Sequence, residues 1–142
     1  ADFLRLGVVH RNIYLDSPRL LDASLLLRSR PDVYFAGQIT GVEGYIESAA
    51  TGLIAGINAA RALAGEVPFV PPAETMLGAL LRHVAESQSP AFAPMNASFG
   101  ILPPIEGRHR KADRRRMACE RACDAMRQTA ARAGLLTDPS AS

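Results

Sequence analysis

Gly37, Gly41 and Gly44 lie between a strand-like segment and a long helix-like segment, and this turn is the part of the sequence best suited to hold a ligand. A strand, a glycine-rich turn and a helix together place backbone N–H groups at a helix N-terminus, facing a ligand at the edge of a sheet. Glycines let a bulky ligand approach because no Cβ stands in the way. A tight turn that binds nothing would need the same glycines, so both interpretations stay open.

Positive charge collects in the last third of the chain. Residues 106–134 contain nine Lys or Arg residues against four Asp or Glu residues, and their pattern predicts a helix. Such a helix can contact the phosphates of a nucleic acid. It can equally be a solvated amphipathic helix that packs on the core through a stripe of apolar residues. The stripe consists of Met117, Ala118, Ala122, Ala125 and Ala133.

A strand before the glycine turn and a helix after it must position the turn. Residues 33–36 are apolar and follow a turn signal, so they predict a buried strand. Residues 45–63 predict a helix that is apolar nearly all round and ends before Gly65. Small residues recur along this helix and would let another backbone approach closely, which predicts tight packing on a sheet. These residues are Ala49, Gly52, Gly56 and Ala60.

Three further segments complete the expected architecture. Ser17 and Pro18 are typical of the start of a short helix. Residues 74–85 have the periodicity of an amphipathic helix. Residues 87–104 are rich in proline but too apolar for a free linker, so we expect an irregular segment that lies against the core.

Length and composition fit one domain. With 142 residues, of which 48% are hydrophobic, the chain can form a single core, and its net charge of +2 does not indicate disorder. We expect a single partial domain over residues 1–142, with the strand, turn and helix in 1–66 and a helical extension in 67–142. Because Ala1 is not an initiator methionine, we expect the numbering to begin inside a longer polypeptide.

The two cysteines, Cys119 and Cys123, do not form a disulfide framework, and their spacing matches no zinc site. We therefore expect no metal and a reducing, cytoplasmic environment. The sequence has no uncharged apolar run long enough to cross a bilayer, so we expect no membrane span.

Residues 34–50 (YFAGQITGVEGYIESAA) closely resemble the flavin-site segment of the folate- and FAD-dependent tRNA (uracil-5-)-methyltransferases. Residues 10–14, 94–96 and 99–104 are similar to the same family, and the resemblance covers essentially residues 3–135. It implies an α/β fold, namely the C-terminal part of a Rossmann-type FAD-binding domain with a basic C-terminal helix. The family's GxGxxG fingerprint and catalytic cysteines have no counterpart in this sequence. We therefore expect no catalytic residue in this segment, and we expect the missing N-terminal part of the same polypeptide as its partner.

In this family, reduced FAD carries a one-carbon unit from methylenetetrahydrofolate to C5 of a uridine in the T-loop of tRNA, and NAD(P)H reduces the flavin again. The resemblance thus implies FAD as cofactor, methylenetetrahydrofolate and NAD(P)H as co-substrates, and tRNA as substrate. It places the flavin's pyrimidine edge at the start of the helix, where amide dipoles face it. The residues expected to bind the cofactor are Gly37, Gln38, Gly41, Val42, Glu43, Gly44 and Tyr45. A glutamate at the start of a helix is also favoured by the helix dipole alone, whether or not a ligand binds.

The residues that the resemblance suggests for folate or tRNA are His10, Arg11, Asn96, Arg114 and Arg115. His10 could stack on the pterin or satisfy turn carbonyls. Arg11 could meet the folate glutamate, a tRNA phosphate or a structural carboxylate. Asn96 could touch flavin or folate, although asparagine in a loop often satisfies backbone groups instead. Arg114 and Arg115 could contact tRNA phosphates or simply keep a helix face solvated.

Two alternatives remain beside the methyltransferase. The FAD-dependent enzymes that modify the wobble uridine of tRNA share the glycine turn and the following helix, but they differ in the string between them. That string is here Val-Glu-Gly-Tyr-Ile-Glu-Ser at 42–48, which favours the methyltransferase. The other alternative is a non-catalytic chain that binds tRNA or a partner protein.

Overall fold

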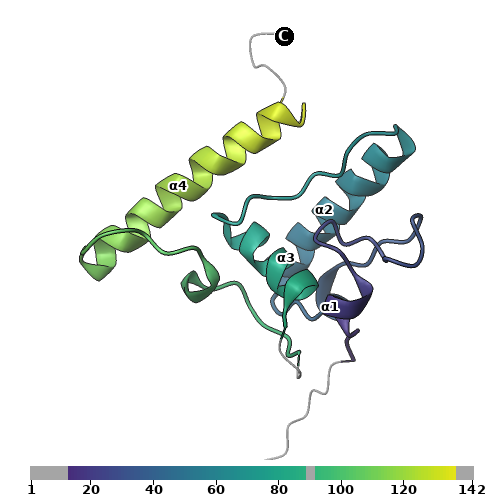
Figure 1. Ribbon diagram of the computed structural model, residues 1–142, viewed down its shortest axis with the longest axis horizontal. Helices are drawn as coiled ribbons and strands as arrows, with labels where there is room; N and C mark the ends of the chain where they lie inside the picture. The colour runs from purple at the N-terminus through teal and green to yellow at the C-terminus, as the bar shows by residue number, and fades with distance from the viewer. Residues whose placement is uncertain (1–12, 89–91, 137–142) are drawn as a thin grey trace, which may run out of the picture.

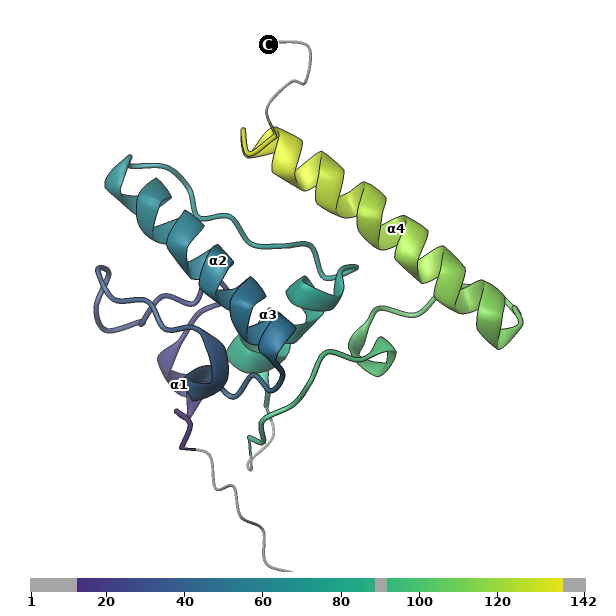
Figure 2. The same ribbon diagram turned by 180° about the vertical axis from the view of Figure 1, so that it is seen from behind.

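The computed structural model describes residues 13–88 and 92–136, and this part of the chain is mainly helical (Figure 1). Helices α1, α2 and α3 gather in one half of the molecule, and α4 lies along the other side in both views (Figures 1 and 2). In chain order the elements are α1 (Ser17–Leu20), the 3-10 turn η1 (Gly37–Thr40), α2 (Tyr45–Leu63), α3 (Met76–Glu86), the 3-10 turn η2 (Phe99–Ile101) and α4 (Lys111–Arg132).

Helix α2 has the bounds that the sequence predicts, Tyr45–Leu63. It ends before Gly65, whose φ of +70° is the left-handed conformation that glycine tolerates at a helix end. Its inner face buries Ile54, Ala55 and Asn58 against the core.

Helix α3 supplies the centre of the core. Leu80, Leu81 and Val84 are all fully buried, as the predicted amphipathic pattern requires. The helix begins at Met76, two residues later than predicted, because the Thr75 hydroxyl accepts a hydrogen bond from the backbone N–H of Gly78 at 2.9 Å and caps the first turn.

The buried strand predicted over residues 33–36 is wrong. The described part of the chain contains isolated bridges, such as Leu26 to Tyr34, but no strand. A strand needs a second extended segment as its partner, and the preceding residues 17–28 are instead used by α1 and a compact turn. The turn predicted before residue 33 does form, and Arg30 Nε donates to Asp32 Oδ1 at 2.9 Å. This hydrogen bond holds the pKa of Asp32 below its usual value.

Helix α4 begins at Lys111 and not at residue 106 as predicted, because Gly107 has a φ of +87° and the chain stays extended up to Arg110. Of the predicted apolar stripe, Ala118 is buried and the other members are half-buried, so the stripe faces the core only in part; Ala130, which was not predicted, is also buried. At its far end, Arg61 Nη1 of α2 donates to the carbonyl oxygen of Ala133 at 2.8 Å. Within residues 13–88 and 92–136, no helix is both long and apolar enough to cross a bilayer.

The outer face of α2 is apolar and open to solvent. Leu53 is 64% exposed and Leu63 is 93% exposed. A Cβ added at Gly52 or Gly56 would meet no described atom within 4 Å. The tight packing on a sheet that these small residues predict is therefore not made within the part of the chain that the structure describes.

Candidate functional site

The glycine turn is a short 3-10 turn fastened to α2. The backbone N–H of Gly37 donates to Thr51 Oγ1 at 2.9 Å, and Thr40 Oγ1 donates to the carbonyl of Gly37 at 2.7 Å. Gly37, Gly41 and Gly44 have φ values of +72°, +83° and +99°. All three positions therefore require glycine for their backbone conformation alone, whatever they bind.

The second half of the turn is joined to the segment that carries Asn96. The N–H of Glu43 donates to the carbonyl of Met95 at 3.0 Å, and the N–H of Met95 donates to the carbonyl of Gly41 at 3.1 Å. Val42 forms the corresponding parallel bridge and is fully buried. The amide of Glu43 is thus used within the protein, and the Val42 side chain faces the core.

Residues at the start of α2 form a small polar cluster. Gly44 and Tyr45 are exposed, and the Glu47 carboxylate lies over Gly44. A Cβ at Gly44 would be 3.1 Å from Asn96 Nδ2. The carboxylate is at the end of α2 that the helix dipole makes positive, and the first N–H groups of any α-helix have no partner within the helix. The structure thus brings Asn96 next to Gly44 at the N-terminus of α2, while Tyr45, the first residue of the helix, is 98% exposed.

Phe92 is a neighbour of the turn that the sequence analysis missed. A Cβ at Gly41 would lie only 2.5 Å from Phe92 Cζ, and Gly41 is buried. The ring is held by Tyr14 and His83, whose ring centroids are 6.0 and 5.6 Å away. A protein side chain, and not an open space for a ligand, therefore lies beside Gly41. No pattern of spacing relates these aromatic residues, so this contact could not be predicted from the sequence.

The other predicted site residues are distributed as follows. Gln38 is exposed on the turn, and His10 and Arg11 lie outside the described residues. Arg114 and Arg115 lie on α4 and are not part of the cluster around Gly44. The structure therefore has two candidate sites: the polar cluster at the start of α2 and a basic one at the start of α4.

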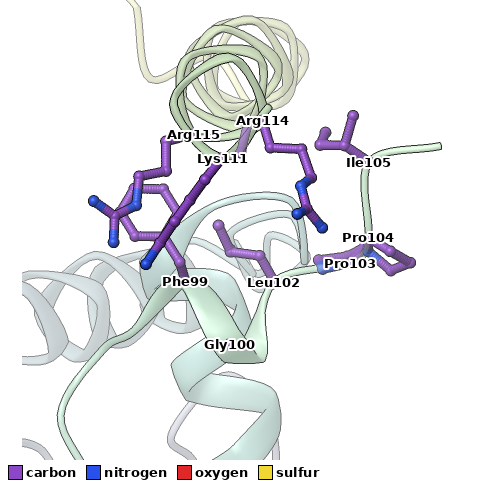
Figure 3. Close-up of a pocket in the computed structure, with 10 residues that line it drawn as sticks. Phe99, Gly100, Leu102, Pro103, Pro104, Ile105, Lys111, Arg114 and Arg115 are labelled. Atoms are coloured by element: carbon purple, nitrogen blue, oxygen red, sulfur yellow. The ribbon is translucent and has the colours of Figure 1, made fainter. Parts of the chain in front are cut away.

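The basic site is a cavity of about 390 Å³ between η2 and α4 (Figure 3). Its walls combine apolar side chains with cations. The guanidinium of Arg115 lies 5.5 Å from the centroid of the Phe99 ring, which is a cation–π distance. The lining residues with a role below are Phe99, Leu102, Pro103, Lys111, Arg114 and Arg115.

Neighbouring arginines of α4 differ in whether they are neutralised. Arg116 lies 3.9 Å from both Asp113 and Glu120. Among residues 13–88 and 92–136, no acidic side chain pairs with Lys111 or Arg114. Lys111 is a cation of this site that the sequence analysis did not single out. Its spacing from Arg114 and Arg115 places it on the same helix face, so helical periodicity could have found it.

Comparison with known proteins shows which protein sequences this chain resembles. A family model described as "Glucose inhibited division protein A" matches residues 1–67. A protein of Geobacter sulfurreducens is 51% identical over 122 residues, which is 86% of this chain and 28% of that protein. A protein of Syntrophomonas wolfei is 59% identical over 106 residues, or 75% of this chain and 24% of that protein. Both are named methylenetetrahydrofolate--tRNA-(uracil-5-)-methyltransferase TrmFO.

The chain is homologous to one segment of this methyltransferase family. It spans 24% to 30% of the length of these curated relatives. A Rhizorhabdus wittichii methyltransferase of the same name is 52% identical over 132 residues and is matched by 89% of this chain. A match of that extent includes the glycine turn and the cationic start of α4, so both candidate sites lie within the homologous segment.

Proposed function

We propose that these residues form part of a folate- and FAD-dependent methyltransferase that methylates C5 of the T-loop uridine of tRNA. The observation that carries the proposal is the 51% identity to a methyltransferase of that name across 86% of the chain. In this proposal the segment is the C-terminal part of a Rossmann-type FAD-binding domain in a cytoplasmic enzyme. The catalytic cysteines and the dinucleotide fingerprint come from the remainder of the polypeptide.

The cluster at the start of α2 is the proposed flavin contact. Bound FAD would supply the carrier for the one-carbon unit and, after reduction by NAD(P)H, the reducing electrons. The residues fit a flavin because Gly44 has no side chain of its own and the Asn96 amide lies beside it, although the Glu47 carboxylate now occupies the space next to Gly44. Free N–H groups of the first turn of α2 can donate to the pyrimidine edge, which becomes anionic on reduction. The Glu47 carboxylate lies over Gly44, so it must turn away before the pyrimidine edge of the flavin can approach.

The remaining predicted contacts have supporting roles in this proposal. Gln38 is exposed at the other end of the turn, where it can donate to the ribityl chain. Gly41 and Val42 are buried, so they contribute by shaping the backbone. His10 and Arg11 are proposed to contact folate.

The open apolar face of α2 is proposed to pack against the rest of the polypeptide. A face with Leu53 and Leu63 exposed is unfavourable in water, because each buried apolar side chain contributes about 1.5–3 kcal/mol. Gly52 and Gly56 have open space around them, which would admit a strand at short distance. The relatives contain the additional length that such packing needs.

The wobble-uridine enzymes are the less favoured alternative, since the relatives that cover most of this chain bear the methyltransferase name. A non-catalytic tRNA-binding chain is supported only by the unpaired cations of α4. It predicts RNA binding without flavin binding, which separates it from the proposed function.

The flavin contact can be tested in a hybrid protein, in which this chain replaces the matching segment of the Geobacter sulfurreducens methyltransferase. Asn96→Asp places a negative charge beside Gly44, where it repels the anionic reduced flavin. We expect the flavin midpoint potential to fall by about 30 mV, which corresponds to about 1.4 kcal/mol for two electrons. Potentiometric titration followed by flavin absorbance measures this change.

Ser98→Asp is the matched control, since Ser98 is exposed in the same loop but is not in the cluster around Gly44. Its potential should stay at that of the unsubstituted hybrid. Equal potentials in the two aspartate variants would contradict the placement of the flavin at the start of α2.

A further inference from the structure

The cavity between η2 and α4 combines features that one class of ligand uses together. Phe99 is 43% exposed although it is a large apolar residue, and it faces the cavity beside Leu102 (Figure 3). Arg115 lies against the same ring, while Arg114 extends toward Pro103 on the opposite side (Figure 3). The result is a recess with apolar walls and cations at its rim.

The cations at the rim are available to an external anion. Lys111 and Arg114 are exposed and have no acidic partner among the residues that the structure describes. They lie in the first turn of α4, where the helix dipole disfavours positive charge. Farther along the helix, Arg127 lies 3.4 Å from Asp124 and is neutralised. Lys111 and Arg114 at the cavity thus lack an acidic partner among the described residues, whereas Arg116 and Arg127 of the same helix each have one.

A second basic hollow extends the positive surface beyond one small ligand. It is formed by the residues just before α4 together with its first turn, and it shares Arg114 with the cavity beside Phe99. Its lining residues are Gly107, Arg108, His109, Arg110 and Arg114. Two adjacent basic hollows fit a polyanion whose charges repeat along a chain, as phosphates do in RNA.

We propose that this cavity binds one unstacked nucleotide of the RNA substrate, with its base against Phe99 and its phosphate between Lys111 and Arg114. Aromatic rings and arginine guanidinium planes hold unpaired bases by stacking, whereas the bases of a duplex are already stacked on each other. The recess therefore selects a loop or an end of the RNA over a helical stem. This inference rests on the proposed function, from which tRNA is taken as the RNA.

The test measures the affinity for an unmodified tRNA transcript, using both the full 142-residue chain and the hybrid protein. The double variant Lys111→Gln with Arg114→Gln should bind at least tenfold more weakly at about 0.1 M salt. The slope of its log–log salt dependence should become shallower by about 0.7, because the one phosphate held between Lys111 and Arg114 is a single-strand contact worth about 0.7. Phe99→Leu should weaken binding about tenfold and leave the slope unchanged, since stacking on a ring involves no counterion release.

Two ion-paired arginines provide the matched control. Arg116→Gln with Arg127→Gln removes the same formal charge from the same helix and should change affinity less than threefold, because both cations are compensated. If the two double variants lose equal affinity, the charge acts through the whole helix and the nucleotide cavity is contradicted. Unchanged affinity in Phe99→Leu would contradict the stacked base.

A folate triglutamate also carries an aromatic ring and several anionic groups, so it is titrated as a competitor. If Phe99→Leu loses its affinity for folate triglutamate but keeps its affinity for tRNA, the cavity is a folate site and the proposal is overturned. A hybrid that methylates tRNA normally in every variant contradicts the cavity but leaves the proposed function intact. A hybrid that binds no tRNA at all contradicts both.

Discussion

Gly78→Ala should lower the melting temperature of the chain by about 10 °C, although alanine is the better helix former. Gly78 is buried in α3, and a Cβ there would lie 2.5 Å from the carbonyl oxygen of Pro71 and even closer to that of Pro72. These are backbone atoms of the connector before the helix, so no rotation of a side chain can relieve the collision. We expect a loss of about 3 kcal/mol, which exceeds the gain of about 1 kcal/mol in helix propensity.

Gly56→Ala is the matched control for this prediction, because Gly56 is also a helical glycine but has open space around it. In the 142-residue chain this control should raise the melting temperature by a few degrees. Thermal unfolding followed by circular dichroism compares the two variants. Equal shifts in the same direction would mean that the connector does not pass close to α3.

Asn58→Ala should destabilise the chain by about 4 kcal/mol and lower its melting temperature by more than 10 °C. The Asn58 side chain is fully buried in α2 and joins three segments. Its Nδ2 donates to the carbonyls of Ser24 at 3.1 Å and Phe69 at 3.0 Å, and its Oδ1 accepts from the N–H of Phe69 at 2.7 Å. Alanine would leave these buried groups without partners, and each such group costs about 1–3 kcal/mol.

Gln38→Ala removes an amide of the same chemical kind from an exposed position and is therefore the control. Its unfolding free energy should stay within about 0.5 kcal/mol of the unsubstituted chain. Urea unfolding at constant temperature measures both values. A loss below about 1 kcal/mol for Asn58→Ala would contradict the role of this side chain as a buried junction.

The helices were predictable because their signals are local. The bounds of α2 follow from the apolar run and Gly65, whereas α3 begins two residues later than predicted because of the cap at Thr75 and ends one residue later, at Glu86. The strand at residues 33–36 was predicted wrongly because a strand depends on a partner that local sequence does not specify.

The candidate sites were predictable to different extents. The three glycines of the turn indicated its conformation, and the proximity of Asn96 follows from a bridge between Val42 and Met95 that no spacing reveals. Net charge identified α4 as basic, but only the ion pairs of Arg116 and Arg127 distinguish these cations from those without an acidic partner. Charge counts cannot make that distinction, because it depends on side-chain geometry.

Methylation of an unmodified tRNA transcript by the hybrid protein tests the central claim most directly. The hybrid is supplied with FAD, methylenetetrahydrofolate and NAD(P)H, and 5-methyluridine is measured by mass spectrometry of nuclease digests. Our account predicts that this chain, 51% identical to the segment it replaces, supports methylation at C5 of the T-loop uridine. A hybrid that melts like the parent enzyme and retains its flavin, yet forms no 5-methyluridine, would contradict it.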